Sequence, residues 1–293
     1  MTRLAPRALV AAAALSAIVT AQQTVFRSGV DVVIVDVAVL DRNKPVADLT
    51  AEDFVVRDNG VRQTVAVIPS ASVPVDLTLA VDTSGSMASA MAVVKTQVEA
   101  AVSTLGTQDQ LRMLTFASGV VELFPMQRPT ANLPFEKFTA GGGTSLYDAL
   151  AAALMRQRRP DRGDLAVVLT DTLDSASAMT MKTVQDLARR SDVLLYVYVV
   201  RSGVDVTVDA RWGRADYGPL RELAATTGGQ LEVILADNQV ATAITRTLAE
   251  FHSRYTLWYT ATGVARGGWH ELSVTLTRPA RFDVRARKGY FGG

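Results

Sequence analysis

The sequence predicts an α/β fold, a doubly wound and mostly parallel sheet, with a small β-sandwich formed by the N- and C-terminal segments. Between residues 74 and 251, continuous apolar stretches of strand length alternate with segments of helical periodicity. Segments 25–70 and 252–293 instead alternate with a period of two and are interrupted by turn residues. Each of these two segments offers only about three strands, which is marginal for an independent domain, so we expect them to pack together.

The composition limits the chemistry that this chain can perform. Of its 293 residues 48% are hydrophobic, which is enough for a substantial core, and the formal net charge of +1 indicates no general attraction for nucleic acid. The lack of cysteine excludes disulfides, thiolate metal sites and cysteine nucleophiles. His252 and His270 are the only histidines, so histidine-based catalysis has few options.

The first 21 residues have the pattern of a secretory signal peptide. Arg3 and Arg7 precede the apolar run ALVAAAALSAIV, and small residues around Ala21 offer a cleavage point. A retained membrane anchor is the alternative, but twelve apolar residues fall short of the ~20 that a spanning helix requires. We therefore expect a secreted or periplasmic protein without stable membrane insertion after cleavage.

The segment 25–70 reads as β-structure that ends in a linker. The run VDVVIVDVAVL (30–40) is long and β-branched, as is typical of a strand. Two further strands flank Asp58-Asn59-Gly60, where the Asn-Gly pair readily supplies the positive φ of a tight hairpin. The stretch PSASVP (69–74) has a proline near either end and marks the start of the α/β region.

Strands and helices then alternate up to residue 252. We expect strands at 75–81, 111–117, 164–170, 192–200 and 230–235, an edge strand at 119–124, and helices at 87–105, 145–157, 180–190, 218–229 and 238–252. Strands this apolar imply a mostly parallel sheet that is covered on both faces. In the C-terminal segment, strands are expected within 253–261, 269–278 and 281–291, with Trp258, Tyr259 and Trp269 mainly as core aromatics.

Oxygen-bearing side chains gather where two of these strands end. Asp82 follows one apolar strand and is succeeded by Ser84 and Ser86, and Asp171 follows another. Thr144 stands between them, after three glycines and directly before a helix. Functional groups of open parallel sheets lie at the carboxyl ends of the strands, so these five residues are expected to meet at one edge.

Two carboxylates and three hydroxyls form a set of hard oxygen donors that suits Mg²⁺ or Mn²⁺, with Ca²⁺ as a further option. The two carboxylates balance the charge of a divalent ion without making the site negative, and five protein oxygens leave at least one coordination position open. A carboxylate from a partner could therefore complete the coordination shell. Taken singly, each residue also has a structural explanation as a helix cap or a turn residue. Their joint placement favours a metal site.

The motifs that carry these residues resemble those of a known family. DTSGSM, GGGTSLYDAL and LTDTLD resemble the three loops of the metal-ion-dependent adhesion site (MIDAS) of von Willebrand factor type A (vWA) domains, which have a Rossmann-like fold. D-x-S-x-S is complete at Asp82, Ser84 and Ser86, and the family threonine and later aspartate correspond to Thr144 and Asp171. The likeness covers residues 74–251. The β segments on either side resemble those of a group of secreted bacterial vWA-related proteins.

The third motif departs from the family pattern. The family usually has D-G-x-D, whereas this chain has Thr172 in place of the glycine. Threonine would strain a turn that needs positive φ, so the loop is expected to be rearranged. Asp174 is then a candidate either to replace Asp171 or to lie behind the metal ligands.

The resemblance implies an adhesion or protein-binding module that engages an acidic partner group through the cation. We expect no enzyme, because recognisable catalytic motifs are absent. Four residues of a long connection (201–217) at the same sheet edge are candidates for ligand specificity: Arg201, Arg211, Trp212 and Arg214. A disordered or internally packed loop is the alternative. A scaffold with a vestigial metal site is a second possibility. A metal-dependent hydrolase is a third, but the chain lacks a G-x-S-x-G elbow, a phosphate-binding-loop lysine and a G-x-G-x-x-G dinucleotide motif.

Overall fold

The computed structural model describes residues 32–69, 73–130, 133–156, 159, 161–171, 173–201, 216–277 and 281–292. The predicted signal peptide, residues 1–21, lies outside the described residues. The same holds for Thr172 and for Arg211, Trp212 and Arg214 of the predicted specificity loop.

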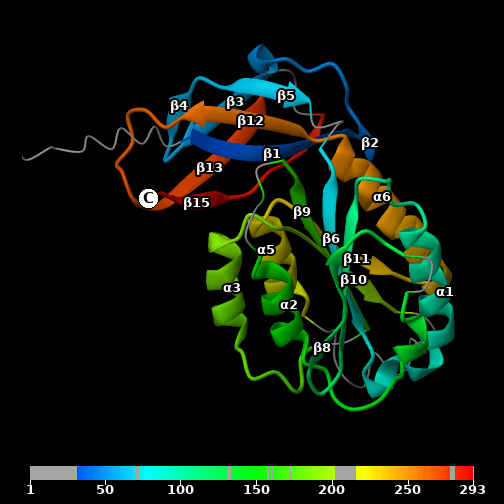
Figure 1. Cartoon of the computed structure of the whole chain (residues 1–293). Helices are drawn as coiled ribbons and strands as arrows, with labels where there is room; N and C mark the ends of the chain where they lie inside the picture. Colours follow the sequence, from blue (N-terminus) through cyan, green and yellow to red (C-terminus); the bar gives the residue numbers. More distant parts are fainter. Residues whose placement is uncertain are drawn as a thin grey trace, which may run out of the picture. The chain divides into compact units, whose positions relative to one another are not determined.

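A six-stranded sheet forms the centre of the α/β region (Figure 1). Its order is β11-β10-β9-β6-β7-β8, and every neighbouring pair is parallel except β7 and β8. The strands are β6 (Val75–Asp82), β7 (Gln110–Phe116), β8 (Val120–Gln127), β9 (Gly163–Thr170), β10 (Leu194–Val200) and β11 (Gln230–Ile234). All residues of β6, β9 and β10 are buried, as expected for strands that are covered on both faces.

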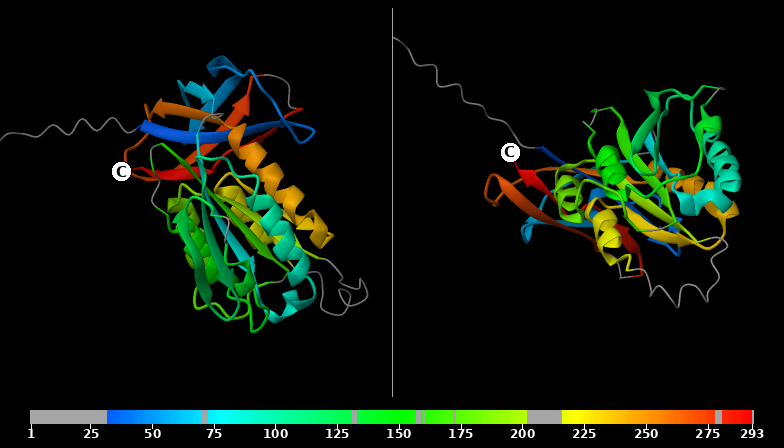
Figure 2. Two further views of the ribbon diagram at one scale, coloured as in Figure 1. Left: turned by 45° about the vertical axis from the view of Figure 1, so that its right-hand side comes forward. Right: turned by 90° about the horizontal axis from the view of Figure 1, so that it is seen from below.

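Helices cover both faces of this sheet (Figures 1 and 2). The apolar cluster on one face contains α1 (Met91–Val102) and α6 (Val240–His252). The cluster on the other face contains α2 (Leu146–Leu154), α3 (Met181–Arg190) and α5 (Gly218–Thr226). Short 3-10 helices are η1 (Ala51–Asp53), η2 (Gly85–Ser89), η3 (Phe135–Lys137) and η4 (Asp237–Gln239). The predicted fold class is therefore confirmed, and helix α2 ends at Leu154, before the predicted end at residue 157.

The two terminal segments interleave in two antiparallel sheets. One has the order β14-β1-β12-β5, with β2 also paired to β1, and the other has the order β15-β13-β3-β4. The strands are β1 (Val32–Asp41), β2 (Lys44–Pro45), β3 (Phe54–Asp58), β4 (Val61–Gln63), β5 (Ala66–Pro69), β12 (Tyr255–Thr260), β13 (Gly268–Leu276), β14 (Asp283–Arg285) and β15 (Gly289–Gly292). Strands from opposite ends of the chain thus lie side by side (blue β1 and orange β12 in Figure 1).

Inward-facing side chains of both sheets form one shared core, which makes the segments a sandwich. Phe54 of β3 and Tyr255 of β12 pack with their ring centroids 5.4 Å apart. The interpretation of Trp258 as a core aromatic was wrong, because its side chain is 41% exposed. In β12 the alternation turns Leu257 and Tyr259 inward, so Trp258 faces outward opposite Ile34.

The predicted hairpin connects β3 to β4. Asn59 and Gly60 have φ values of 45° and 82°, and Asp58 pairs with Val61 across the turn. Successive positive φ values are those of the tight turn that matches strand twist, and Asn-Gly adopts them at low cost.

Arg254, just before β12, joins the sandwich to the α/β region. Its guanidinium is buried and donates to the carbonyl oxygens of Asp36 in β1 and Gly228 before β11, at 3.4 and 2.9 Å. It also pairs with Glu250 of α6 at 3.0 Å, and Arg285 of β14 pairs with the same carboxylate at 3.3 Å. A buried cation is therefore compensated by partners from both parts of the fold.

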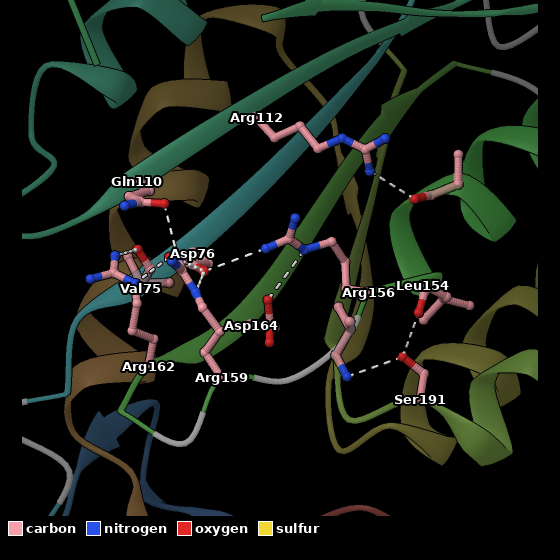
Figure 3. Close-up of polar contacts among 12 residues, drawn as sticks. Val75, Asp76, Gln110, Arg112, Leu154, Arg156, Arg159, Arg162, Asp164 and Ser191 are labelled. Atoms are coloured by element: carbon pink, nitrogen blue, oxygen red, sulfur yellow. Dashed lines mark hydrogen bonds and ion pairs between the residues drawn. The ribbon is translucent and has the colours of Figure 1, made fainter. Parts of the chain in front are cut away.

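The amino-terminal ends of β6 and β9 carry a charged cluster (Figure 3). Asp76 and Asp164 lie opposite each other in the parallel register, and both are buried. Three arginines from the α2–β9 connection converge on Asp76: Arg156 at 3.4 Å, Arg162 at 2.5 Å, and Arg159 in close contact. Arg156 also pairs with Asp164 at 3.4 Å. The protein thus supplies its own cations where two carboxylates face each other across the sheet.

We predict that the sandwich depends on contacts made by the C-terminal strands. Replacing Leu257, which is fully buried, by alanine leaves a cavity and should lower the free energy of unfolding by about 2–5 kcal/mol. Replacing exposed Thr260 of the same strand should change it by less than about 0.5 kcal/mol. Urea unfolding of both variants measures the difference, and equal losses would contradict the assigned core.

Candidate metal centre

The parallel pairing of β6 and β9 brings Asp82 and Asp171 to the same edge of the sheet. Val81 lies opposite Leu169 in the register, so Asp82, the last residue of β6, is level with Thr170, the last residue of β9. Asp171 follows directly. The ends of β6 and β9 therefore meet at one edge of the sheet, as the sequence predicts.

Hydrogen bonds connect these carboxylates through two serines. The Asp82 carboxylate accepts from the Ser84 backbone N–H at 2.8 Å and from the Thr170 hydroxyl at 2.6 Å. The hydroxyls of Ser84 and Ser86 are 3.1 Å apart, and Ser86 donates to Asp171 Oδ1 at 2.8 Å. Oxygen atoms thus form an unbroken chain from Ser84 to Asp171.

Both carboxylates are held in an environment that disfavours their negative charge. Burial raises the pKa of Asp82, and hydrogen bonds from Ser84 and Thr170 offset this only in part. Burial also raises the pKa of Asp171, and the nearby charge of Asp82 raises it further. Ser86 and the positive charge of Arg201 act in the opposite direction. A divalent cation at this edge would relieve both the burial penalty and the mutual repulsion.

Thr144 reaches the same edge because its glycine loop is bonded to the loop after β6. The Gly141 N–H donates to the Thr83 carbonyl at 2.8 Å, and the Gly85 N–H donates to the Gly142 carbonyl at 3.0 Å. Gly142 has a φ of 80°, and a Cβ there would lie 2.5 Å from the Ser118 hydroxyl oxygen. The glycine is thus required both for its backbone conformation and for its lack of a side chain. Thr144 itself is 3% exposed.

The loop after Asp171 holds Thr144 from the other side. The Thr144 N–H donates to the Ser175 hydroxyl at 3.0 Å. Its carbonyl oxygen accepts from the N–H groups of Ser175 and Ala176 at 2.9 and 3.0 Å. The backbone that carries the candidate ligand Thr144 is therefore fixed by the loop that carries the candidate ligand Asp171.

Asp174, which the sequence offered as a replacement for Asp171 or as a residue behind the metal ligands, forms its hydrogen bonds at the start of α2. Its carboxylate accepts from the Tyr147 N–H in the first turn of α2 at 3.1 Å and from the Ser177 hydroxyl. Its hydrogen bonds therefore go to the start of a helix, and none joins it to Asp82, Ser84, Ser86 or Asp171. Asp148 of α2 reciprocates by accepting from the N–H groups of Ala178 and Met179 at 3.0 and 2.9 Å.

Sequence reasoning missed Thr170, Ser175 and Ser177. Thr170 directly follows the apolar run 165–169 of β9, which was the available signal for its contact with Asp82. The two serines follow Asp171 in a polar stretch, but their partners lie about 30 residues away in sequence. Ser145 is also fully buried beside Thr144, and its hydroxyl has no hydrogen-bond partner among the described residues.

The donor set fits a hard divalent cation. It contains carboxylate and hydroxyl oxygens and no sulfur or imidazole, as Mg²⁺, Mn²⁺ and Ca²⁺ prefer. In the part of the chain that the structure describes, no group of three or more His, Cys, Asp or Glu side chains is arranged to hold a metal ion.

The comparisons with known proteins assign the family. The model of the von Willebrand factor type A domain matches residues 76–246, more than half of the chain, and this chain therefore belongs to the vWA domain family. A search of curated proteins gives no match.

Solved structures show the same fold. A von Willebrand factor type A protein from Catenulispora acidiphila shares 15% identity with a TM-score of 0.52, covering 83% of this chain and 75% of that one. Proximal thread matrix protein 1 from the mussel byssus shares 15% identity with a TM-score of 0.50, covering 67% of this chain and 50% of that one. That second structure is described as having a zinc-occupied MIDAS motif.

Within the described ranges, none of the helices has both the length and the apolar character needed to cross a bilayer.

We predict that Asp174 stabilises the start of α2. Asp174→Ala should lower the free energy of unfolding by about 0.5–2 kcal/mol, because the Tyr147 N–H loses its acceptor. Asp174→Asn should retain most of the stability, since the amide oxygen can still accept. Thermal or urea unfolding in the presence of a chelator measures both, and an unchanged stability of Asp174→Ala would contradict this role.

Proposed function

We propose that this protein binds a partner protein by coordinating one of its aspartate or glutamate side chains to a divalent cation. Asp82, Ser84, Ser86, Thr144 and Asp171 would hold the cation. The observation that carries the proposal is the pairing of two carboxylates, whose negative charge burial disfavours, with a chain of hydroxyls at the carboxyl edge of the sheet.

A comparison within the same pair of strands supports this proposal. At the amino-terminal ends of β6 and β9, Asp76 and Asp164 are compensated by Arg156, Arg159 and Arg162. At the carboxyl-terminal ends, the immediate partners of Asp82 and Asp171 are hydroxyl and N–H groups. Such partners orient carboxylates without neutralising them, which suits a site that receives its positive charge from an ion.

The contacts suggest which residues would coordinate the cation directly and which would act through charge or a bridging water. Both oxygens of Asp82 already accept hydrogen bonds, so Asp82 would act mainly through its charge or through a bridging water. Ser84, Ser86 and Thr144 would coordinate directly. Mg²⁺ and Mn²⁺ bind oxygen ligands and usually keep some coordinated water, so this set of ligands favours them, with Ca²⁺ as a further option. The zinc-occupied motif in the mussel protein supports a divalent ion in general.

The cellular location and the lack of enzyme activity are also part of the proposal. The signal-like residues 1–21 support a secreted or periplasmic location, and the lack of recognisable catalytic motifs supports a binding protein rather than an enzyme. A scaffold with a vestigial site is the competing function, and metal titration separates the two.

We predict saturable one-to-one binding of Mg²⁺ and Mn²⁺ by the purified protein in isothermal titration calorimetry. Asp82→Ala and Thr144→Ala should each abolish metal binding, because the first removes a negative charge and the second removes a hydroxyl ligand. Asp186→Ala, which removes an exposed carboxylate on α3, is the control and should bind like the unaltered protein. Absence of binding in the unaltered protein, with and without an acidic peptide, would instead support the vestigial scaffold.

We also predict that stability and metal binding respond oppositely to Asp82→Asn. With a chelator present, the variant should be at least as stable as the unaltered protein, because it removes a buried charge that repels Asp171. Mg²⁺ at one hundred times its Kd should stabilise the unaltered protein by about 2.7 kcal/mol and the variant not at all. Urea unfolding with and without Mg²⁺ measures this, and equal stabilisation of both proteins would contradict the site.

A further inference from the structure

Helix α3 ends beside β15 of the sandwich (Figure 1), where two of its arginines lie over aromatic rings. The guanidinium carbon of Arg189 is 5.7 Å from the centroid of the Trp269 ring, and that of Arg190 is 4.1 Å from the centroid of the Phe291 ring. Trp269 of β13 and Phe291 of β15 lie opposite each other in the antiparallel register, with ring centroids 5.4 Å apart in an edge-to-face contact. These four residues form one arginine–aromatic surface.

Within the residues that the structure describes, the two arginines of this surface form no ion pair with a carboxylate. Neighbouring cations do form such pairs: Arg287 lies 2.5 Å from Asp192, and Lys288 lies 2.8 Å from Glu222. Both arginines are exposed and stand in the last turn of α3, where the helix dipole favours positive charge. The dipole explains why arginine occurs there, but it does not explain why both side chains turn towards an aromatic pair.

The contact with the rings leaves both arginines able to bind an anion. A guanidinium over a ring uses its face, while its N–H groups lie at its edge and can still donate to a carboxylate or sulfate in a bidentate manner. The rings also restrict the two long side chains, so less conformational entropy is lost when a ligand binds. The arrangement therefore suits a ligand that carries negative charges.

The surroundings of this surface favour one class of anionic ligand. A stable protein partner would need about 800 Å² with an apolar centre, whereas the neighbouring Arg287 and Lys288 are charged and ion-paired. Single-stranded nucleic acid would need open ring faces for its bases, but each ring here has a guanidinium over it. A sugar chain needs only anionic groups that reach the arginines and C–H groups that contact Phe291, which is 38% exposed.

We propose that the arginine–aromatic surface binds an anionic polysaccharide that carries one carboxylate on each sugar. Carboxylates of the chain bind Arg189 and Arg190, and sugar C–H groups contact Phe291. Glu271 lies two residues after Trp269 on the same face of β13, and its negative charge opposes binding. This binding requires no divalent cation, so it is independent of the candidate metal centre.

The experiment titrates short galacturonate oligomers into the isotope-labelled full protein at low salt. A chelator keeps divalent ions from the sugar carboxylates and from the candidate metal centre. The indole N–H resonance of Trp269, identified by its loss in Trp269→Phe, should shift in a saturable way. The resonance of Trp258, which lies in the other sheet of the sandwich, should not shift. Methyl-esterified oligomers are the matched uncharged probe and should bind far more weakly.

Substitutions should change the affinity in two directions. Arg189→Ala together with Arg190→Ala should raise the Kd about tenfold or more, because charge-assisted hydrogen bonds are lost. Lysine at both positions keeps the charge and should retain part of the affinity. Glu271→Gln should lower the Kd about two- to threefold, because a nearby negative charge is removed. Lys44→Ala together with Arg62→Ala removes two exposed positive charges elsewhere in the sandwich and is the control, with no expected change.

Each outcome decides the proposal. A saturable shift of the Trp269 resonance, weakened by the alanine pair and strengthened by Glu271→Gln, supports it. Absence of binding, equal binding of the esterified oligomers, or an equal loss in the control pair overturns it. Tighter binding of polyphosphate or of an acidic peptide overturns the choice of a polysaccharide. Where circular dichroism shows that the alanine pair does not fold, the lysine pair and Glu271→Gln decide by the same criteria. Because a chelator is present throughout, failure here leaves the proposed metal-dependent function standing.

Discussion

The parallel pairing of β6 with β9 is the constraint on which the functional edge depends. Its register sets carboxylates close together at both ends of the same two buried strands, Asp76 opposite Asp164 and Asp82 close to Asp171. Like charges at such short range are unfavourable, so each end needs compensation. Arginines supply it at the amino-terminal ends. At the carboxyl-terminal ends the protein supplies oriented hydroxyl and N–H groups, an arrangement that a bound cation would complete.

The loops around that edge act together because each is hydrogen-bonded to another. The glycine loop before α2 is joined to the loop after β6 through Gly85 and Gly142, and Thr144 is joined to the loop after β9 through Ser175. Reciprocal capping by Asp148 and Asp174 then fixes that last loop to α2. The candidate ligands are thus carried by loops that are hydrogen-bonded to one another and to α2, and such support reduces the ordering cost that binding would otherwise carry.

Much of this arrangement could be predicted from the sequence, because its signals are local. Apolar strand runs that end in Asp82 and Asp171, and the spacing of Ser84 and Ser86, place those residues at one edge without any knowledge of contacts. The roles of Asp174 and Ser175 could not be predicted in this way, since their partners lie in α2 and in the segment before it. The prediction for Trp258 was wrong although the signal was local. Neighbouring residues of a strand point to opposite faces, so Trp258 and Tyr259 could not both face the core, and Tyr259 is the one that does.

Insertion of the α/β region between the two sandwich segments also bears on where the candidate site lies. The chain enters at Val75, whose N–H binds the Asp109 carboxylate at 2.9 Å, and it leaves after α6, where His252 lies 4.0 Å from the same carboxylate. Entry and exit are therefore adjacent, at the amino-terminal end of β6. Asp82 ends the same eight-residue strand, and at ~3.3 Å per residue this places it roughly 20 Å away. Both connections to the sandwich thus lie at the opposite end of β6 from the candidate metal edge.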